Sequence, residues 1–190
     1  MSKKPPQAPE TPDGFEVVRD IGAGRFPLLD VFRGLERSPA FREYPGTDAL
    51  RRKLARKTTT DISRRKGEWM YVAPHVLPPD APKQWRPIVT PDDCIAVSGE
   101  HLRKSPAFVL YLDVLHELYH VVQRWNGREL WDEAYEYVDR PTEVEAYRFA
   151  VDEARRLGAT DAFLRDYLKV VWTSPAEHRR LLKNVGVSAR

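Results

Sequence analysis

The run from residue 107 to residue 122 constrains the fold most, because nearly all of its side chains are apolar. Ser105 and Pro106 precede the run, and this pair is typical of a helix N-cap followed by the first helical residue. Gly127 follows it and predicts the end of a helix. A helix that is apolar on all sides is buried, so we expect a long helix in the centre of the domain.

Four polar side chains interrupt this run: Asp113, His116, Glu117 and His120. Their spacing places them along one side of a helix, where a buried polar group is costly unless it finds a partner. His116 and His120 are one helical turn apart, so both imidazoles can reach one metal ion. Glu117 would then lie near a water molecule on that ion. The sequence therefore predicts a Zn²⁺ site with Glu117 as general base.

A catalytic zinc site needs a third protein ligand, and a second predicted helix at residues 141–157 offers two glutamates. The stripe that contains Glu143 is small and apolar, its other members being Ala146, Ala150, Ala154 and Leu157. Such a stripe predicts close packing on another helix. Glu145 lies on a more polar stripe, and it forms a capping box with Thr142 unless Pro141 is the first helical residue. We favour Glu143 as the third ligand, with Glu145 as the alternative.

The two predicted helices together resemble those of the gluzincin metallopeptidases, most closely the ImmA/IrrE type and related compact zincins. The likeness rests on His-Glu-Leu-Tyr-His, on Glu-Val-Glu-Ala from Glu143 and on Phe149-Ala150, and it covers roughly residues 92–157. It implies a zincin-like α+β fold, with a small mixed or antiparallel sheet followed by a mainly helical half. It also implies a zinc-dependent peptidase. Related enzymes place an aspartate four residues after the ligand glutamate; that register selects Glu143 and puts Tyr147 in place of the aspartate.

Further roles follow from the same resemblance. In zincins the strand ahead of the metal helix is an edge along which an extended substrate lies, so we expect a peptide or protein substrate along the Cys94–Ser98 edge strand. Thermolysin-like enzymes stabilise the oxyanion with a downstream histidine, for which His178 is the candidate, beside Tyr147. Asp113, one turn before His116, is the candidate for orienting that histidine.

The remaining chain predicts one domain, residues 15–190, after a proline-rich tail at residues 1–14 that is disordered or extended. His75 is expected at the surface, and His101 in a loop without a partner. Tyr135 or Tyr137 would face the cleft or simply pack. The other predicted elements are strands at 15–18 and 69–73, and helices at 28–35, 48–55, 129–138, 162–172 and 175–184, the last capped by Ser174.

Residues 51–66 form a basic run, with eight lysine or arginine residues against Asp61 alone. A solvated surface explains this run better than a nucleic-acid interface, because no aromatic residues interleave with it. The basic run nevertheless leaves one alternative function open, a catalytically inactive or regulatory zincin-like module that binds nucleic acid. A hydrolase of non-peptide amides is a second alternative. A di-iron protein needs a second Glu-x-x-His motif, which the chain lacks.

Composition adds limits on location rather than on chemistry. The net charge of +3 and the pI near 9.0 are only weak signs of an anionic partner. A single cysteine excludes an intramolecular disulfide and suits a reducing compartment. The first residues have no apolar segment typical of a signal peptide, and charged residues in the long apolar run argue against a membrane span. We therefore expect a cytoplasmic protein.

Overall fold

The computed structural model describes residues 7–43, 58–63, 71–72 and 94–189. The predicted helix at 48–55, His75 and most of the basic run lie outside the described residues. The described chain is an α+β fold, which confirms the predicted fold class.

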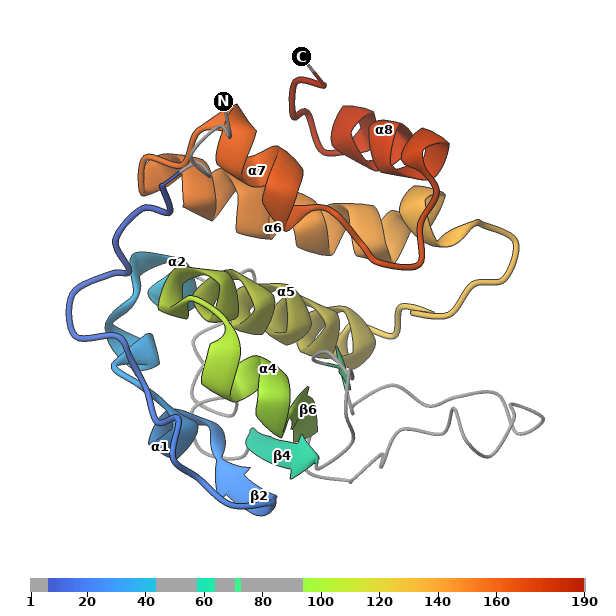
Figure 1. Ribbon diagram of the computed structural model, residues 1–190. Coiled ribbons are helices and arrows are strands. Elements are labelled where there is room, and N and C mark those ends of the chain that lie inside the picture. Colours follow the sequence, from blue (N-terminus) through green and yellow to red (C-terminus); the bar gives the residue numbers. More distant parts are fainter. Residues whose placement is uncertain (1–6, 44–57, 64–70, 73–93, 190) are drawn as a thin grey trace.

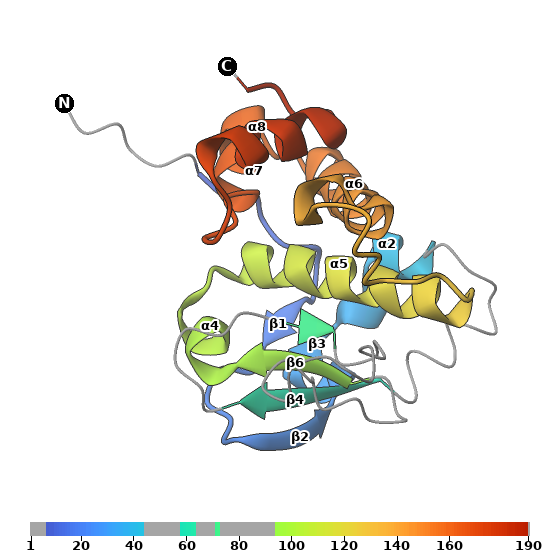
Figure 2. The same cartoon turned by 90° about the vertical axis from the view of Figure 1, so that its right-hand side faces the viewer.

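The larger sheet is mixed, and its strands follow the order β2 (Gly24–Pro27), β4 (Thr59–Ser63), β6 (Cys94–Ser98) and β5 (Tyr71–Val72). Only the β4–β6 pair is parallel. A second, antiparallel pair joins β1 (Glu16–Val17) to β3 (Phe32–Arg33). The mixed sheet lies on one side of the long central helix, and the helices that follow residue 140 lie on the other (Figures 1 and 2).

The longer helices belong to the second half of the chain: α4 (Gly99–Lys104), α5 (Ala107–Trp125), α6 (Pro141–Arg156), α7 (Asp161–Tyr167) and α8 (Pro175–Asn184). The shorter ones are α1 (Leu28–Val31), η1 (Leu35–Arg37), α2 (Pro39–Arg42) and η3 (Tyr137–Asp139). None of the described helices combines the length and apolarity that crossing a membrane requires.

Helix α5 is the buried helix that the apolar run predicts. It lies between the sheet and α6, so it buries side chains on both sides (Figure 2). It begins at Ala107, one residue later than predicted, with Pro106 at the N-cap position. The Ser105 hydroxyl instead lies 2.7 Å from Nδ1 of His101. The helix ends as predicted, since Gly127 adopts a φ of 74° that favours glycine.

Strand β6 confirms the predicted strand at Cys94–Ser98, but the prediction that it is an edge strand is wrong. β4 pairs with it on one side and β5 on the other. The reason is visible in its side chains, since Cys94, Ile95 and Val97 are all buried. A continuous apolar run is typical of a central strand that is covered on both faces. In the described part of the chain, β5 ends the sheet on this side.

Helix α6 packs along α5 through the predicted stripe of small residues, and Gly158 follows its end with a φ of 90°. Of the two alternatives for its start, Pro141 as the first helical residue is confirmed, and the Thr142 capping box does not form. Arg140 is the N-cap and caps with no side chain, because Pro141 takes the first helical position. The Thr142 hydroxyl, now inside the helix, donates to the Leu130 carbonyl at 3.3 Å.

The prediction of a helix at 129–138 is wrong, because local side chains form hydrogen bonds with the backbone N–H groups there. The Glu129 carboxylate accepts from the Trp131 N–H at 2.9 Å, and Asp132 accepts from the Ala134 N–H at 3.0 Å. Such bonds compete with helical ones. Only the single turn of η3 follows.

For the two C-terminal helices, the start of α8 was predicted correctly and the end of α7 was not. The capping box of α8 at Ser174 is confirmed. Helix α7 ends at Tyr167, five residues before the predicted end at residue 172.

The N-terminal region also differs from the prediction at 28–35, where α1 ends at Val31 and the chain continues as β3. Pairing with β1 and a left-handed turn at Gly34 end the helix early; a Cβ at Gly34 would lie 1.9 Å from the Gly14 carbonyl oxygen. Residues 7–14 contain no helix or strand, yet Ala8 packs against the core. This part of the proline-rich tail has no regular secondary structure and ends in a turn at residues 13–14.

Candidate metal centre

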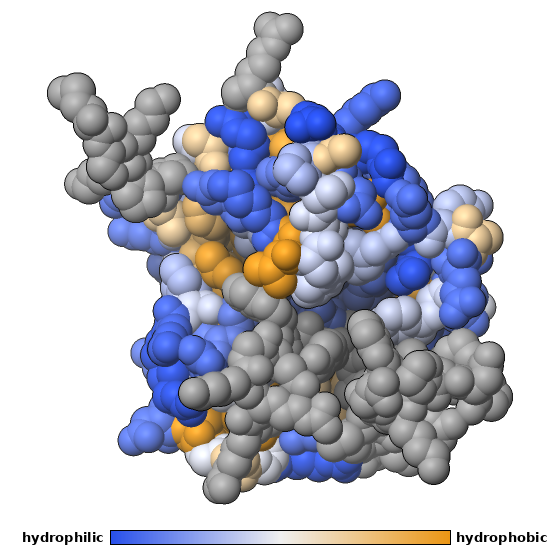
Figure 3. All heavy atoms as spheres, turned by 45° about the vertical axis from the view of Figure 1, so that its right-hand side comes forward, coloured by the Kyte–Doolittle hydropathy of each residue, from blue (hydrophilic) through white to orange (hydrophobic). Residues whose placement is uncertain are grey.

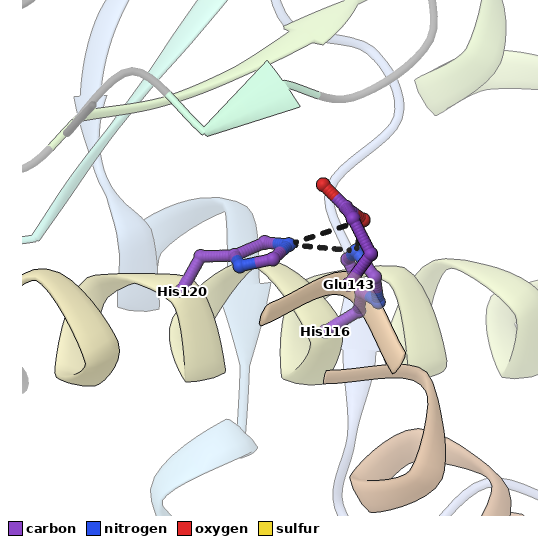
Figure 4. Close-up of side chains that lie close together, drawn as sticks. All are labelled: His116, His120 and Glu143. Atoms are coloured by element: carbon purple, nitrogen blue, oxygen red, sulfur yellow. Dashed lines mark hydrogen bonds and ion pairs between the residues drawn. The ribbon is translucent and has the colours of Figure 1, made fainter. Parts of the chain in front are cut away.

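Three predicted ligands converge at the interface of α5 and α6. His116 and His120 project from the middle of α5, and Glu143 reaches them from the first turn of α6 (Figure 4). The two Nε2 atoms lie 3.1 Å apart, and Oε2 of Glu143 lies 3.4 Å from each. Zinc bonds of 2.0–2.1 Å to a tetrahedral set of ligands separate those ligands by about 3.3–3.4 Å. The three atoms are therefore spaced as zinc ligands are.

The chemistry of these groups also fits a cation. All three residues are buried and group together as possible metal ligands. Oε2 of Glu143 accepts no hydrogen bond from any described residue, although it is buried. A buried carboxylate oxygen without a hydrogen bond is costly, and a metal ion at the centre of the three atoms would compensate it.

The protonation states suit metal binding as well. Burial lowers the pKa of His116, which keeps its imidazole neutral. Burial also acts to raise the pKa of Glu143, but the neighbouring imidazoles of His120 and His116 outweigh it and hold that pKa well below its usual range. A neutral His116 and an ionised Glu143 are the forms in which these two residues bind a metal.

Glu117 lies beside this group without belonging to it. Its side chain is buried, and Oε2 has no hydrogen-bond partner among the described residues. Burial raises its pKa well above the usual range, and the charges of Glu143 and Asp113 add to the effect. A carboxyl group with a raised pKa can exchange a proton near neutral pH, as a general base must.

A pocket of about 390 Å³ gives access to His116 and Glu117. Its apolar lining includes Phe163 and the segment Val170–Trp172. Val171 is 72% exposed and Trp172 62% exposed, so this segment forms the outer wall of the pocket. Figure 3 shows the helical half covered mainly by hydrophilic residues, with only small hydrophobic areas between them.

Aromatic side chains connect the metal centre to that outer wall. The Tyr147 ring lies 4.2 Å from the His116 ring, and its hydroxyl lies 2.9 Å from the Tyr137 hydroxyl. The Tyr137 ring in turn contacts Trp172 edge-on, with centroids 5.8 Å apart. Tyr147 and Tyr137 both line the pocket. The predicted Tyr147 therefore lies beside the metal group, and Tyr137 is the member of the Tyr135–Tyr137 pair that faces the pocket.

Asp113 does not orient His116, contrary to the prediction. Its Oδ2 lies 2.8 Å from Nε2 of His101, and its charge adds to the burial that raises the pKa of Tyr167. Nδ1 of His116 has no hydrogen-bond partner in the described chain. The prediction that His101 lies in a loop without a partner is also wrong, because His101 belongs to α4. His101 and Tyr167 both line the pocket and were missed, since only the fold brings them to Asp113.

Other candidates lie outside the metal group. His178 lies in the N-terminal part of α8, and its Nε2 atom lies 3.2 Å from the Arg165 carbonyl oxygen. It is not among the described residues that line the pocket. Glu145 pairs with Arg128 and Gln123 instead of facing the two histidines. Cys94 is buried in β6 and does not join the metal group.

Comparison with protein-family models, curated proteins and solved structures finds no match. The function is therefore argued from the geometry and chemistry of this site.

Proposed function

We propose that this protein is a zinc-dependent metallopeptidase of the compact gluzincin kind, with a zincin-like fold. One observation carries the proposal: three buried ligand atoms at tetrahedral spacing, from His116, His120 and Glu143, lie next to a buried Glu117. A purely structural zinc site has no need of an additional carboxylate beside it. A catalytic site does, because water must lose a proton as it attacks a carbonyl.

In the proposed reaction, Glu117 transfers a proton and Tyr147 stabilises the oxyanion. A bound zinc ion would polarise the peptide carbonyl and lower the pKa of the attacking water. Glu117 takes the proton from that water on a carboxylate oxygen and then transfers it to the leaving amine. Tyr147, beside His116 and in the pocket, is placed to donate its hydroxyl hydrogen to the developing oxyanion. We do not assign that role to His178, because it is not among the described residues that line the pocket.

The charge of the ligand set favours the same reaction. Two neutral imidazoles and one carboxylate neutralise only half of the charge of Zn²⁺. With zinc bound, these three residues would leave a net positive charge, which would favour the negative charge that develops on the carbonyl oxygen. Burial raises the pKa of Glu117, and a bound cation would act in the opposite direction by favouring the ionised carboxylate, which is the form that accepts the proton.

The test is cleavage of a mixed peptide library by the zinc-loaded protein, with Glu117→Gln as the matched variant. Glutamine has nearly the same shape but cannot take the proton. We expect Glu117→Gln to retain zinc and to lose about 10²- to 10⁴-fold in cleavage rate. Equal cleavage by both proteins would contradict the role of Glu117. If the wild type binds zinc and cleaves no peptide, the result would instead favour a zinc-binding module or a hydrolase of other amides.

A further inference from the structure

One hydrogen-bonded chain leads from the protein surface to His120. Nδ1 of His120 lies 2.8 Å from Oε1 of Gln123, which is buried one turn further along α5. Nε2 of Gln123 donates to the Thr142 carbonyl at 3.0 Å and to the Glu145 carboxylate at 2.9 Å. The other oxygen of Glu145 accepts from Arg128 at 3.1 Å.

The chemistry of these partners determines which way the Gln123 amide faces. A carbonyl oxygen and a carboxylate only accept hydrogen bonds, so both must face the NH₂ group. The amide oxygen of Gln123 is therefore the atom that faces His120. An amide oxygen only accepts, so Nδ1 of His120 carries the hydrogen. In a neutral imidazole, Nε2 then carries the lone pair, and it is Nε2 that lies near His116 and Glu143.

We propose that Gln123 is a positioning residue that holds His120 in its metal-binding tautomer and fixes it relative to the glutamate on α6. The inference rests on the proposed zinc site. The same amide bonds both to His120 and to the Thr142 carbonyl, one residue before Glu143. It therefore joins two ligands that come from different helices. His116 has no comparable support, because its Nδ1 has no hydrogen-bond partner among the described residues.

Zinc affinity of the purified protein, measured by competition with a chelator, gives the first test. Gln123→Met keeps the length of the side chain and removes both sets of hydrogen bonds. We expect it to weaken zinc binding about 10- to 100-fold, the usual cost of losing a partner of a ligand histidine. Arg128→Ala is the matched control, because it removes only the outermost link, and its affinity should stay within about twofold of wild type. An affinity of Gln123→Met within twofold of wild type would overturn the proposal.

A second measurement reads the tautomer itself without zinc, and its deciding result comes from the wild type alone. Proton–nitrogen correlation NMR of the metal-free wild type distinguishes an imidazole with hydrogen on Nδ1 from one with hydrogen on Nε2. We expect His120 to carry its hydrogen on Nδ1 in wild type and to populate the Nε2 form in Gln123→Met. Hydrogen on Nε2 of His120 in wild type would refute the proposal even if Gln123→Met failed to fold.

These readouts separate the inference from the proposed function. A wild type that cleaves no peptide, while Gln123→Met loses zinc affinity and changes the His120 tautomer, contradicts the peptidase and supports Gln123. A wild type that cleaves peptides, while Gln123→Met binds zinc as wild type does, contradicts the role of Gln123 and leaves the peptidase in place.

Discussion

The inner and outer walls of the pocket are built in opposite ways. The inner wall, with His116 and Glu117, belongs to a buried helix that packs against α6. The outer wall, Val170–Trp172, lies in the connection between α7 and α8 and is largely exposed. Reacting groups must be held within fractions of an ångström, whereas apolar contacts to a substrate tolerate variation. In the proposed peptidase, the packed helices would therefore carry the chemistry and the connection would select the substrate.

Filling the space between α5 and α6 should break the inner wall. Ala150 is fully buried on the face of α6 that packs on α5. We expect Ala150→Leu to lower the free energy of unfolding by about 1–3 kcal/mol, because the larger side chain forces the helices apart. Urea denaturation of the zinc-free wild type and variant measures this change in the free energy of unfolding. Asp152→Leu, exposed on the same helix, should change stability by no more than about 0.5 kcal/mol. Equal effects of the two variants would contradict the close packing.

Removing the largest side chain of the outer wall should change binding and leave the chemistry intact. We expect Trp172→Ala to raise KM about three- to tenfold for peptides with a large apolar side chain, with kcat within twofold. Tyr135→Ala is the matched control, since Tyr135 is an exposed aromatic residue that is absent from the described pocket lining. A fall in kcat with unchanged KM would show that the two walls do not divide the work in this way.

The start of α7, the helix that precedes the outer wall, should add a small stabilisation that depends on pH. Asp161, at the start of α7, accepts from the Ser188 N–H and pairs with Arg155, and these contacts lower its pKa. A carboxyl group with a lowered pKa stabilises the fold above its unfolded pKa, near 4, and loses that effect as pH falls through its folded pKa. We expect Asp161→Asn to cost a few tenths of a kcal/mol at pH 7, because the pair is half exposed.

Thermal unfolding of wild type and Asp161→Asn at pH 7 and pH 3 measures this contribution. The difference between the two proteins should shrink at pH 3. A difference that grows as the pH falls would contradict the assigned sign.

The metal group was predictable from the sequence because its geometry is local. One helical turn brings His116 to His120, and the stripe of small residues on α6 placed Glu143 rather than Glu145 against α5. The edge assignment of β6 was not predictable in the same way, because it depends on pairing with β4 and β5 from distant parts of the chain.

The hydrogen-bond partners of Asp113 and Gln123 also depend on distant parts of the chain. Asp113 was predicted to serve His116, but the fold brings His101 from α4 and Tyr167 from α7 to its carboxylate. Gln123 carried a signal that was missed: it follows His120 by three residues, a spacing at which helical side chains meet. Its second set of contacts, to Thr142 and Glu145, requires the packing of α6 on α5.

The measurement that tests the account most directly is the zinc content of three purified proteins: wild type, Glu143→Ala and Glu145→Ala. The two glutamates are two residues apart on one helix, and only Glu143 faces the histidines. We predict about one zinc ion per chain in wild type, most of it lost in Glu143→Ala and most of it kept in Glu145→Ala. Full zinc in Glu143→Ala, or none in wild type supplied with zinc, would contradict the site.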